Sequence, residues 1–161
     1  MDQIVSAAEK EFVPNVDLES TETNVEEIVG HAAHSMSKDV SARNYKAKLV
    51  SIVHASKVAQ RLAKYRPKLD HICFTTDPRV SRELNLVWGV RSVLLEKLEA
   101  EDVENLVSGV ILAGVDMGLL HREETVIAMC SSHRYSGHAG ITCVYKVRAV
   151  LKKMRPETEE N

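Results

Sequence analysis

Six consecutive residues of the chain combine side chains that suit the binding of an anion. They are residues 53–58, V-H-A-S-K-V, which lead from the apolar run 48–53 into the helix-like segment 57–64. The first N–H groups of a helix have no partner within the helix, and its dipole is positive at that end, so a preceding loop can hold a phosphate. Lys57 adds a positive charge and Ser56 a hydroxyl group. The stretch therefore predicts a phosphate-binding loop, with a plain helix start that binds nothing as the alternative.

A second loop, residues 131–140, carries histidines and glycines between two strand-like runs. Glycine lets a backbone approach a ligand closely, and histidine titrates near neutral pH. This loop can close over the same ligand from the other side, although turn glycines and ordinary loop histidines give the same pattern. The candidate binding residues of the two loops are His54, Ala55, Ser56, Lys57, Val58, Gly137, His138 and Gly140.

Catalytic and metal sites find less support. A hydrolytic site needs a nucleophile, a base and an orienting partner, and Ser56 with His54, two residues apart around a turn, does not supply that geometry. His31 and His34 are spaced to share a metal ion, but spacing places no third ligand beside them. The three cysteines are widely spaced and lack a C-x-x-C pair, which favours reduced, buried thiols. We predict no catalytic residue and no metal ligand in this chain.

Length and charge limit the classes of function. A chain of 161 residues suffices for one domain with its own core, and its net charge of −2 gives no general attraction to nucleic acid or anionic lipid. No apolar run approaches the roughly 18 residues of a membrane span, and the first residues lack the features of a secretory signal. We therefore expect a cytoplasmic protein that contacts neither nucleic acid nor membrane.

Helical and strand-like periods alternate along the chain, which predicts an α/β fold of three layers with a mostly parallel, five-stranded sheet. The loop 131–140 is too short for a crossover helix, so the final strand should be an antiparallel edge strand. The expected strands are 48–53, 71–75, 90–95, 125–130 and 141–150, and the expected helices are 24–40, 57–64 capped by Ser56, a helix from Asp77-Pro78 ending near Gly89, and 100–119.

The expected domain organisation has three parts. Residues 1–20 are interpreted as the remnant of a preceding helix plus a linker, residues 21–150 as a single α/β domain, and residues 151–161 as a charged, flexible tail. The last strand is a candidate sheet edge, and an unpaired edge can recruit the same strand of a second copy. Lys146 and Arg148 offer the alternative of a protected, monomeric edge.

Several motifs in this order carry a resemblance to a known family. They are A-K-Y-R-P at 63–67, S-R-E-L-N-L-V-W-G-V at 81–90, G-L-L at 118–120, and G-x-x-G-I-T at 137–142 leading into V-Y-K-V. Over about residues 24–150 the chain resembles the C-terminal domain of pyruvate kinase. The resemblance implies an enzyme that moves a phosphoryl group from phosphoenolpyruvate to ADP in glycolysis, with magnesium and potassium.

In that family the reaction occurs on a separate (β/α)8 barrel, for which 161 residues leave no room. No cofactor is therefore implied for this chain. The resemblance implies instead a domain that supplies subunit contacts, hence a homo-oligomer, and that in many members binds a sugar phosphate effector such as fructose 1,6-bisphosphate. The alternative is a free-standing protein of the same fold that binds a phosphometabolite or a protein partner.

The effector motif of the family is only partly present. Where effector-binding members have Thr-x-Ser-Gly-[Arg/Lys]-[Ser/Thr], this chain has V-H-A-S-K-V at 53–58, and Lys57 alone matches cleanly. Leu106 also stands where some members place an effector-binding arginine. Fewer hydroxyl donors and a missing glycine weaken contact with a phosphate. We therefore expect an altered or absent effector site rather than an intact one.

Overall fold

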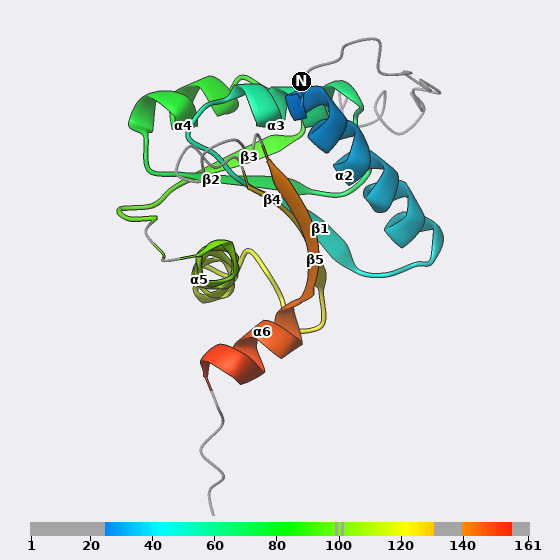
Figure 1. Ribbon diagram of the computed structural model, residues 1–161, viewed down its shortest axis with the longest axis vertical. Coiled ribbons are helices and arrows are strands. Elements are labelled where there is room, and N and C mark those ends of the chain that lie inside the picture. The colour runs from blue at the N-terminus through cyan, green and yellow to red at the C-terminus, as the bar shows by residue number, and fades with distance from the viewer. Residues whose placement is uncertain (1–24, 99, 101, 131–139, 156–161) are drawn as a thin grey trace, which may run out of the picture.

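The computed structural model describes residues 25–98, 100, 102–130 and 140–155 and forms a three-layer α/β fold around one five-stranded sheet (Figure 1). The strand order is β3-β2-β1-β4-β5, with β1 in the centre. The predicted fold class is confirmed. The strands are β1 Ala47–Ile52, β2 His71–Thr75, β3 Val90–Leu94, β4 Thr125–Cys130 and β5 Ile141–Lys146.

Four of the strands run parallel, and the fifth reverses direction. β1 pairs in parallel with both β2 and β4, β2 pairs in parallel with β3, and β4 pairs with β5 in antiparallel fashion. The central strands β2 and β4 are almost wholly buried, as expected for parallel strands covered by helices on both faces. The antiparallel edge strand follows from the short connection between β4 and β5, as predicted.

The helices divide between the two faces of the sheet (Figure 1). One core cluster joins α2, α3 and α4 to side chains such as Leu49 and Ile127, and the other joins α5 and α6 to side chains such as Phe74. Alternation along the strands sends neighbouring residues to opposite clusters. The helices are α2 Val25–Ala42, α3 Lys57–Lys64, α4 Pro78–Leu84, α5 Val103–Asp116 and α6 Val147–Met154.

The predicted helix start at Asp77 is confirmed, whereas the predicted end near Gly89 and the predicted cap at Ser56 are wrong. The Asp77 carboxylate accepts the Arg79 N–H at 2.7 Å, and the Asp102 carboxylate accepts the Asn105 N–H at 2.7 Å. The predicted helix end near Gly89 is wrong, because α4 ends at Leu84 with Asn85 as its C-cap. Gly89, with a φ of 71°, lies in the turn that leads to β3, a conformation that glycine adopts without strain. Ser56, by contrast, has helical angles and makes no side-chain capping bond to α3.

The predicted strand 141–150 is wrong in its second half. β5 ends at Lys146, and α6 begins at Val147, so residues 151–154, expected in the tail, complete a helix. Val147 and Val150 are buried against the second core cluster, with Leu151 packed beside them. This spacing of three and four residues is helical, and it overlaps the alternation that predicted a strand.

The other domain limits stay predictions, because residues 1–24 lie outside the described part of the chain. None of the described helices is long and apolar enough to cross a bilayer. The three cysteines are free thiols, as predicted, but Cys143 is half-buried, whereas Cys73 and Cys130 are buried. Burial raises the pKa of Cys73 to about 12.

A buried histidine lies at the start of β2 and makes the fold sensitive to acid. His71 is 2% exposed, and its Nε2 lies 2.7 Å from Ser51 Oγ and 3.3 Å from Cys73 Sγ. Burial lowers its pKa from 6.5 to about 4, because a charged imidazole loses its hydration there. The folded protein therefore holds this side chain neutral under conditions in which the unfolded chain protonates it.

We expect the free energy of unfolding to fall as the pH drops from about 6.5 to about 4, by up to about 3 kcal/mol from this residue. The unfolded state binds a proton in this range and the folded state does not, so acid favours unfolding. Urea denaturation at several pH values measures the slope, with the His71→Gln variant as reference. An identical slope in the variant contradicts the assignment.

Candidate functional site

The predicted phosphate-binding loop lies at the carboxyl end of the central strand. β1 ends at Ile52 and α3 begins at Lys57, and the Val53 N–H donates to the Phe74 carbonyl at 3.0 Å, which fixes the start of the loop. The strand order reverses between β1 and β4, and ligands of open α/β sheets bind at such a switch point. The loops that follow β1 and β4 are the two that sequence singled out, so the topology brings the start of one and the end of the other to the same edge.

Within the first loop, His54, Ala55 and Lys57 are exposed, while Ser56 and Val58 are buried. Lys57, the first residue of α3, thus presents its ammonium group to solvent beside the first N–H groups of the helix. Val58 packs in the core beneath the loop. The exposed cation and the helix start are the two features of this loop that suit an anion.

Ser56 has a partner that sequence did not predict. Its hydroxyl donates to Glu83 Oε2 at 2.8 Å, and Arg79 Nε lies 3.1 Å from the other oxygen of the same carboxylate. The hydroxyl group is therefore already engaged, and a negative charge stands near the start of α3. Both effects oppose the binding of a phosphate, because the carboxylate repels it and competes for the Ser56 proton.

The second loop is described only at its end. Gly137 and His138 lie outside the described residues, and Gly140 immediately precedes β5. A Cβ atom at Gly140 would lie 3.1 Å from a Val29 methyl group of α2, which is closer than ordinary contact. Glycine at this position therefore serves a close approach to α2. Leu106 of α5 packs against the core on the opposite face of the sheet and brings no polar group to the loop.

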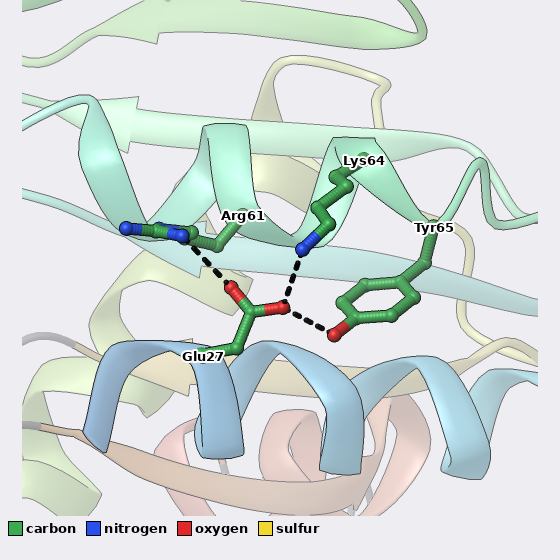
Figure 2. Close-up of polar contacts among 4 residues, drawn as sticks. All are labelled: Glu27, Arg61, Lys64 and Tyr65. Atoms are coloured by element: carbon green, nitrogen blue, oxygen red, sulfur yellow. Dashed lines mark hydrogen bonds and ion pairs between the residues drawn. The ribbon is translucent and has the colours of Figure 1, made fainter. Parts of the chain in front are cut away.

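A buried carboxylate holds the far end of α3 in place (Figure 2). Glu27 of α2 is fully buried, and its two oxygens receive Arg61 Nη1 at 3.1 Å and Lys64 Nζ at 3.0 Å. The Tyr65 hydroxyl donates to the same carboxylate. One side chain thus ties α2 to two residues of α3 and to its C-cap, and thereby orients the helix whose start forms part of the first loop.

The charge of Glu27 is kept despite its burial. Burial raises the pKa of the carboxyl group, but the hydrogen bonds from Tyr65 and Lys64 and the charges of Lys64 and Arg61 together lower it below its usual value. The carboxylate is therefore ionised at neutral pH and fully paired. A buried charge without partners is strongly destabilising, so the three donors are a condition of its presence.

Sequence reasoning missed Glu27, since an acid in the first turn of a helix is normally a solvated dipole partner. The signal in the sequence for such a partner was two cations and a tyrosine at 61, 64 and 65, because this spacing lets all three side chains contact one neighbouring residue. His31 and His34, considered as a metal pair, instead pack around the Tyr65 ring at 5.6 Å and 5.2 Å between centroids. In the described part of the chain, no group of three or more histidine, cysteine or acidic residues can hold a metal ion.

Comparison with known sequences finds one consistent group of relatives. The sequence profile of the pyruvate kinase alpha/beta domain matches residues 27–147. The chain is 26% identical over 129 residues to the pyruvate kinase of Agrobacterium vitis, which covers 80% of the chain and 27% of that relative. It is 25% identical over 150 residues to pyruvate kinase 2 of Synechocystis, covering 93% of the chain and 24% of the relative. The chain thus spans about a quarter of the length of these relatives.

Solved structures show the same fold. A crystal structure of Cryptosporidium parvum pyruvate kinase superposes with a TM-score of 0.62 at 21% identity, covering 90% of the chain and 26% of that structure. The same enzyme in complex with ADP superposes with a TM-score of 0.60 at 22% identity, covering 89% of the chain and 26% of that structure. At such low sequence identity, the structural similarity shows the fold alone.

Replacing Glu27 with glutamine should lower the free energy of unfolding by about 1–3 kcal/mol, because Arg61 and Lys64 lose their charged acceptor. Glu104→Gln is a matched control, since the Glu104–Lys153 pair lies at the surface with both side chains more than half exposed. That change should cost less than about 1 kcal/mol. Urea denaturation of both variants at pH 7 compares the two, and equal losses would contradict an anchoring role for Glu27.

Proposed function

Since this chain belongs to the pyruvate kinase family through its alpha/beta domain, we propose that it is the regulatory and subunit-assembly domain of a pyruvate kinase. The whole enzyme would transfer a phosphoryl group from phosphoenolpyruvate to ADP in the cytoplasm, on a barrel that lies outside this chain. The observation that carries the proposal is the profile match over 27–147 together with the pair of loops at the sheet's switch point.

Magnesium and potassium belong, in this proposal, to the barrel of the parent enzyme. The described residues offer no cluster of metal-binding side chains, and the first loop presents a lysine and backbone N–H groups, which attract anions rather than cations. The domain's own ligand would then be a phosphate-bearing effector, for which the candidate residues are His54, Ala55, Ser56, Lys57, Val58, Gly137, His138 and Gly140.

We further propose that the effector site is altered and binds weakly. The exposed Lys57 and the start of α3 attract a phosphate, whereas Glu83, held beside Ser56, repels it. Glu83 is itself 41% exposed and paired with Arg79, so its charge is partly screened. The balance favours weak rather than absent affinity for a sugar phosphate.

The effector proposal predicts opposite effects for two substitutions. Lys57→Ala should weaken the binding of fructose 1,6-bisphosphate about fivefold, and Glu83→Gln should strengthen it by a similar factor, since each changes one partly screened charge worth about 1 kcal/mol. Titration calorimetry measures both. Lys152→Ala, which removes an exposed cation from α6, is the matched control and should leave the affinity unchanged.

No heat with any sugar phosphate, or equal affinity in the parent chain and Lys57→Ala, would remove the phosphate loop from the proposed function.

The assembly proposal rests on the outer edge of β5. Among the residues that the structure describes, this strand pairs only with β4, so its other edge is open within the described sheet. Val144 of β5 is 52% exposed. Helix α2 contacts β5, and its residue Ile28 is 57% exposed. An open strand edge beside exposed apolar side chains suits pairing with a second copy of the same chain.

Val144→Asp should therefore shift the chain toward the monomer, because two charges would meet and lose water across a symmetric interface. Leu86→Asp is a matched control, since Leu86 is 90% exposed and lies beyond α4, away from β5. Sedimentation equilibrium over a range of concentrations measures both. A parent chain that stays monomeric throughout, or dissociation by Leu86→Asp alone, would contradict assembly through β5.

A further inference from the structure

A pocket lies at the edge of the sheet opposite the effector loop. It is formed where the amino ends of β1, β2 and β3 meet the turn after α5, and its volume is about 380 Å³. This size falls in the range of small-molecule pockets. Because the effector loop follows the carboxyl end of β1, the two places are separated by the length of that strand, and the pocket does not belong to the site described above.

The pocket has an apolar floor with a cation on each side, and Asp70, just before β2, also lines it. Ile72 of β2 pairs in register with Arg91 of β3, so their side chains lie on the same face of the sheet, and Lys48 of β1 also points to this face. Leu119 and Gly118 close the pocket from the α5 side. A lysine and an arginine flanking a short apolar surface suit a small molecule with an acidic group.

Lys48 is held ready to bind and is largely removed from water. Its side chain is 18% exposed, and Nζ donates to the Leu119 carbonyl at 2.8 Å. The nearby carboxylates of Glu124 and Asp70 lie at 3.7 Å and 3.9 Å, beyond hydrogen-bond range. An ammonium group has three donors, so this one retains capacity for a ligand.

The nearby acids do not cancel this attraction. Glu124 is 11% exposed, and its second oxygen accepts the His121 N–H at 2.8 Å, so this carboxylate is shared between Lys48 and the backbone. Asp70 is 79% exposed, and water screens its charge. Arg91 is exposed at the pocket and adds the further positive charge, with a planar group that can grip a carboxylate or phosphate by two bonds.

We propose that the Lys48–Arg91 pocket binds a small organic anion, a carboxylate or phosphate monoester on a short apolar body, as a ligand site separate from the effector loop. The acidic group lies between the two cations, and the apolar body covers Ile72 and Leu119. The proposal does not depend on the proposed function, because it uses neither the loop 53–58 nor self-association.

Nuclear magnetic resonance of the full 161-residue chain tests the site, with acetate, inorganic phosphate and glycerol phosphate as probes at constant ionic strength. Saturable shifts are expected in the Ile72 and Leu119 methyl signals and in the Arg91 Nε–H signal. Arg91→Gln, an exposed substitution that leaves the core intact, should weaken binding at least about tenfold, as should Lys48→Met. Acetate against the two phosphates shows which acidic group is preferred.

The control variant is Lys57→Met, which removes the cation of the effector loop and should leave these shifts unchanged. Shifts lost in Lys57→Met but kept in Arg91→Gln would place the anion at the effector loop and overturn the proposal. So would equal affinity in all variants, or the absence of any saturable shift at these signals. Failure here leaves the fructose 1,6-bisphosphate titration of the effector loop untouched.

Discussion

The parallel pairing of β1 with both β2 and β4 is the constraint on which the rest of the structure depends. It places β1 at the centre of the sheet and reverses the strand order beside it, so the loops after β1 and β4 must emerge at the same edge. The amino ends of β1, β2 and β3 meet at the opposite edge, where the Lys48–Arg91 pocket lies. Both candidate sites are therefore consequences of one pairing pattern.

Helix α2 connects the parts that the sheet leaves separate. Glu27 binds α3 through Arg61, Lys64 and Tyr65, and Gly30 lies directly against α3, where a Cβ would be in ordinary contact with the backbone of Arg61 at 3.5 Å. One residue before Gly30, Val29 meets Gly140 just before β5. Helix α2 thus contacts α3, which starts at the first loop, and it also contacts the end of the second loop. A displacement of either loop would be transmitted to α2 through packed contacts rather than through solvent.

Sequence predicted most of the fold because its local signals agreed. The helix 57–64 and the strands 71–75 and 125–130 are predicted to the residue, and Asp77-Pro78 gives a helix start with both of its usual signals. The prediction failed at Val147–Val150, where a helix follows directly on a strand and the helical spacing of apolar residues overlaps the alternation of a strand.

The side-chain partners of the candidate site were beyond sequence for a different reason. Ser56 and Glu83 are 27 residues apart, and Glu27 and Arg61 are 34 apart, so only the packing of whole helices brings them together. The two cases also differ in what they do. Glu27 is buried and fully paired, so any change there costs stability, whereas Ser56 and Glu83 meet at the rim of the loop. Residues at this rim can therefore change while the sheet and its two cores stay the same, which is how one family fold can be kept around different loops.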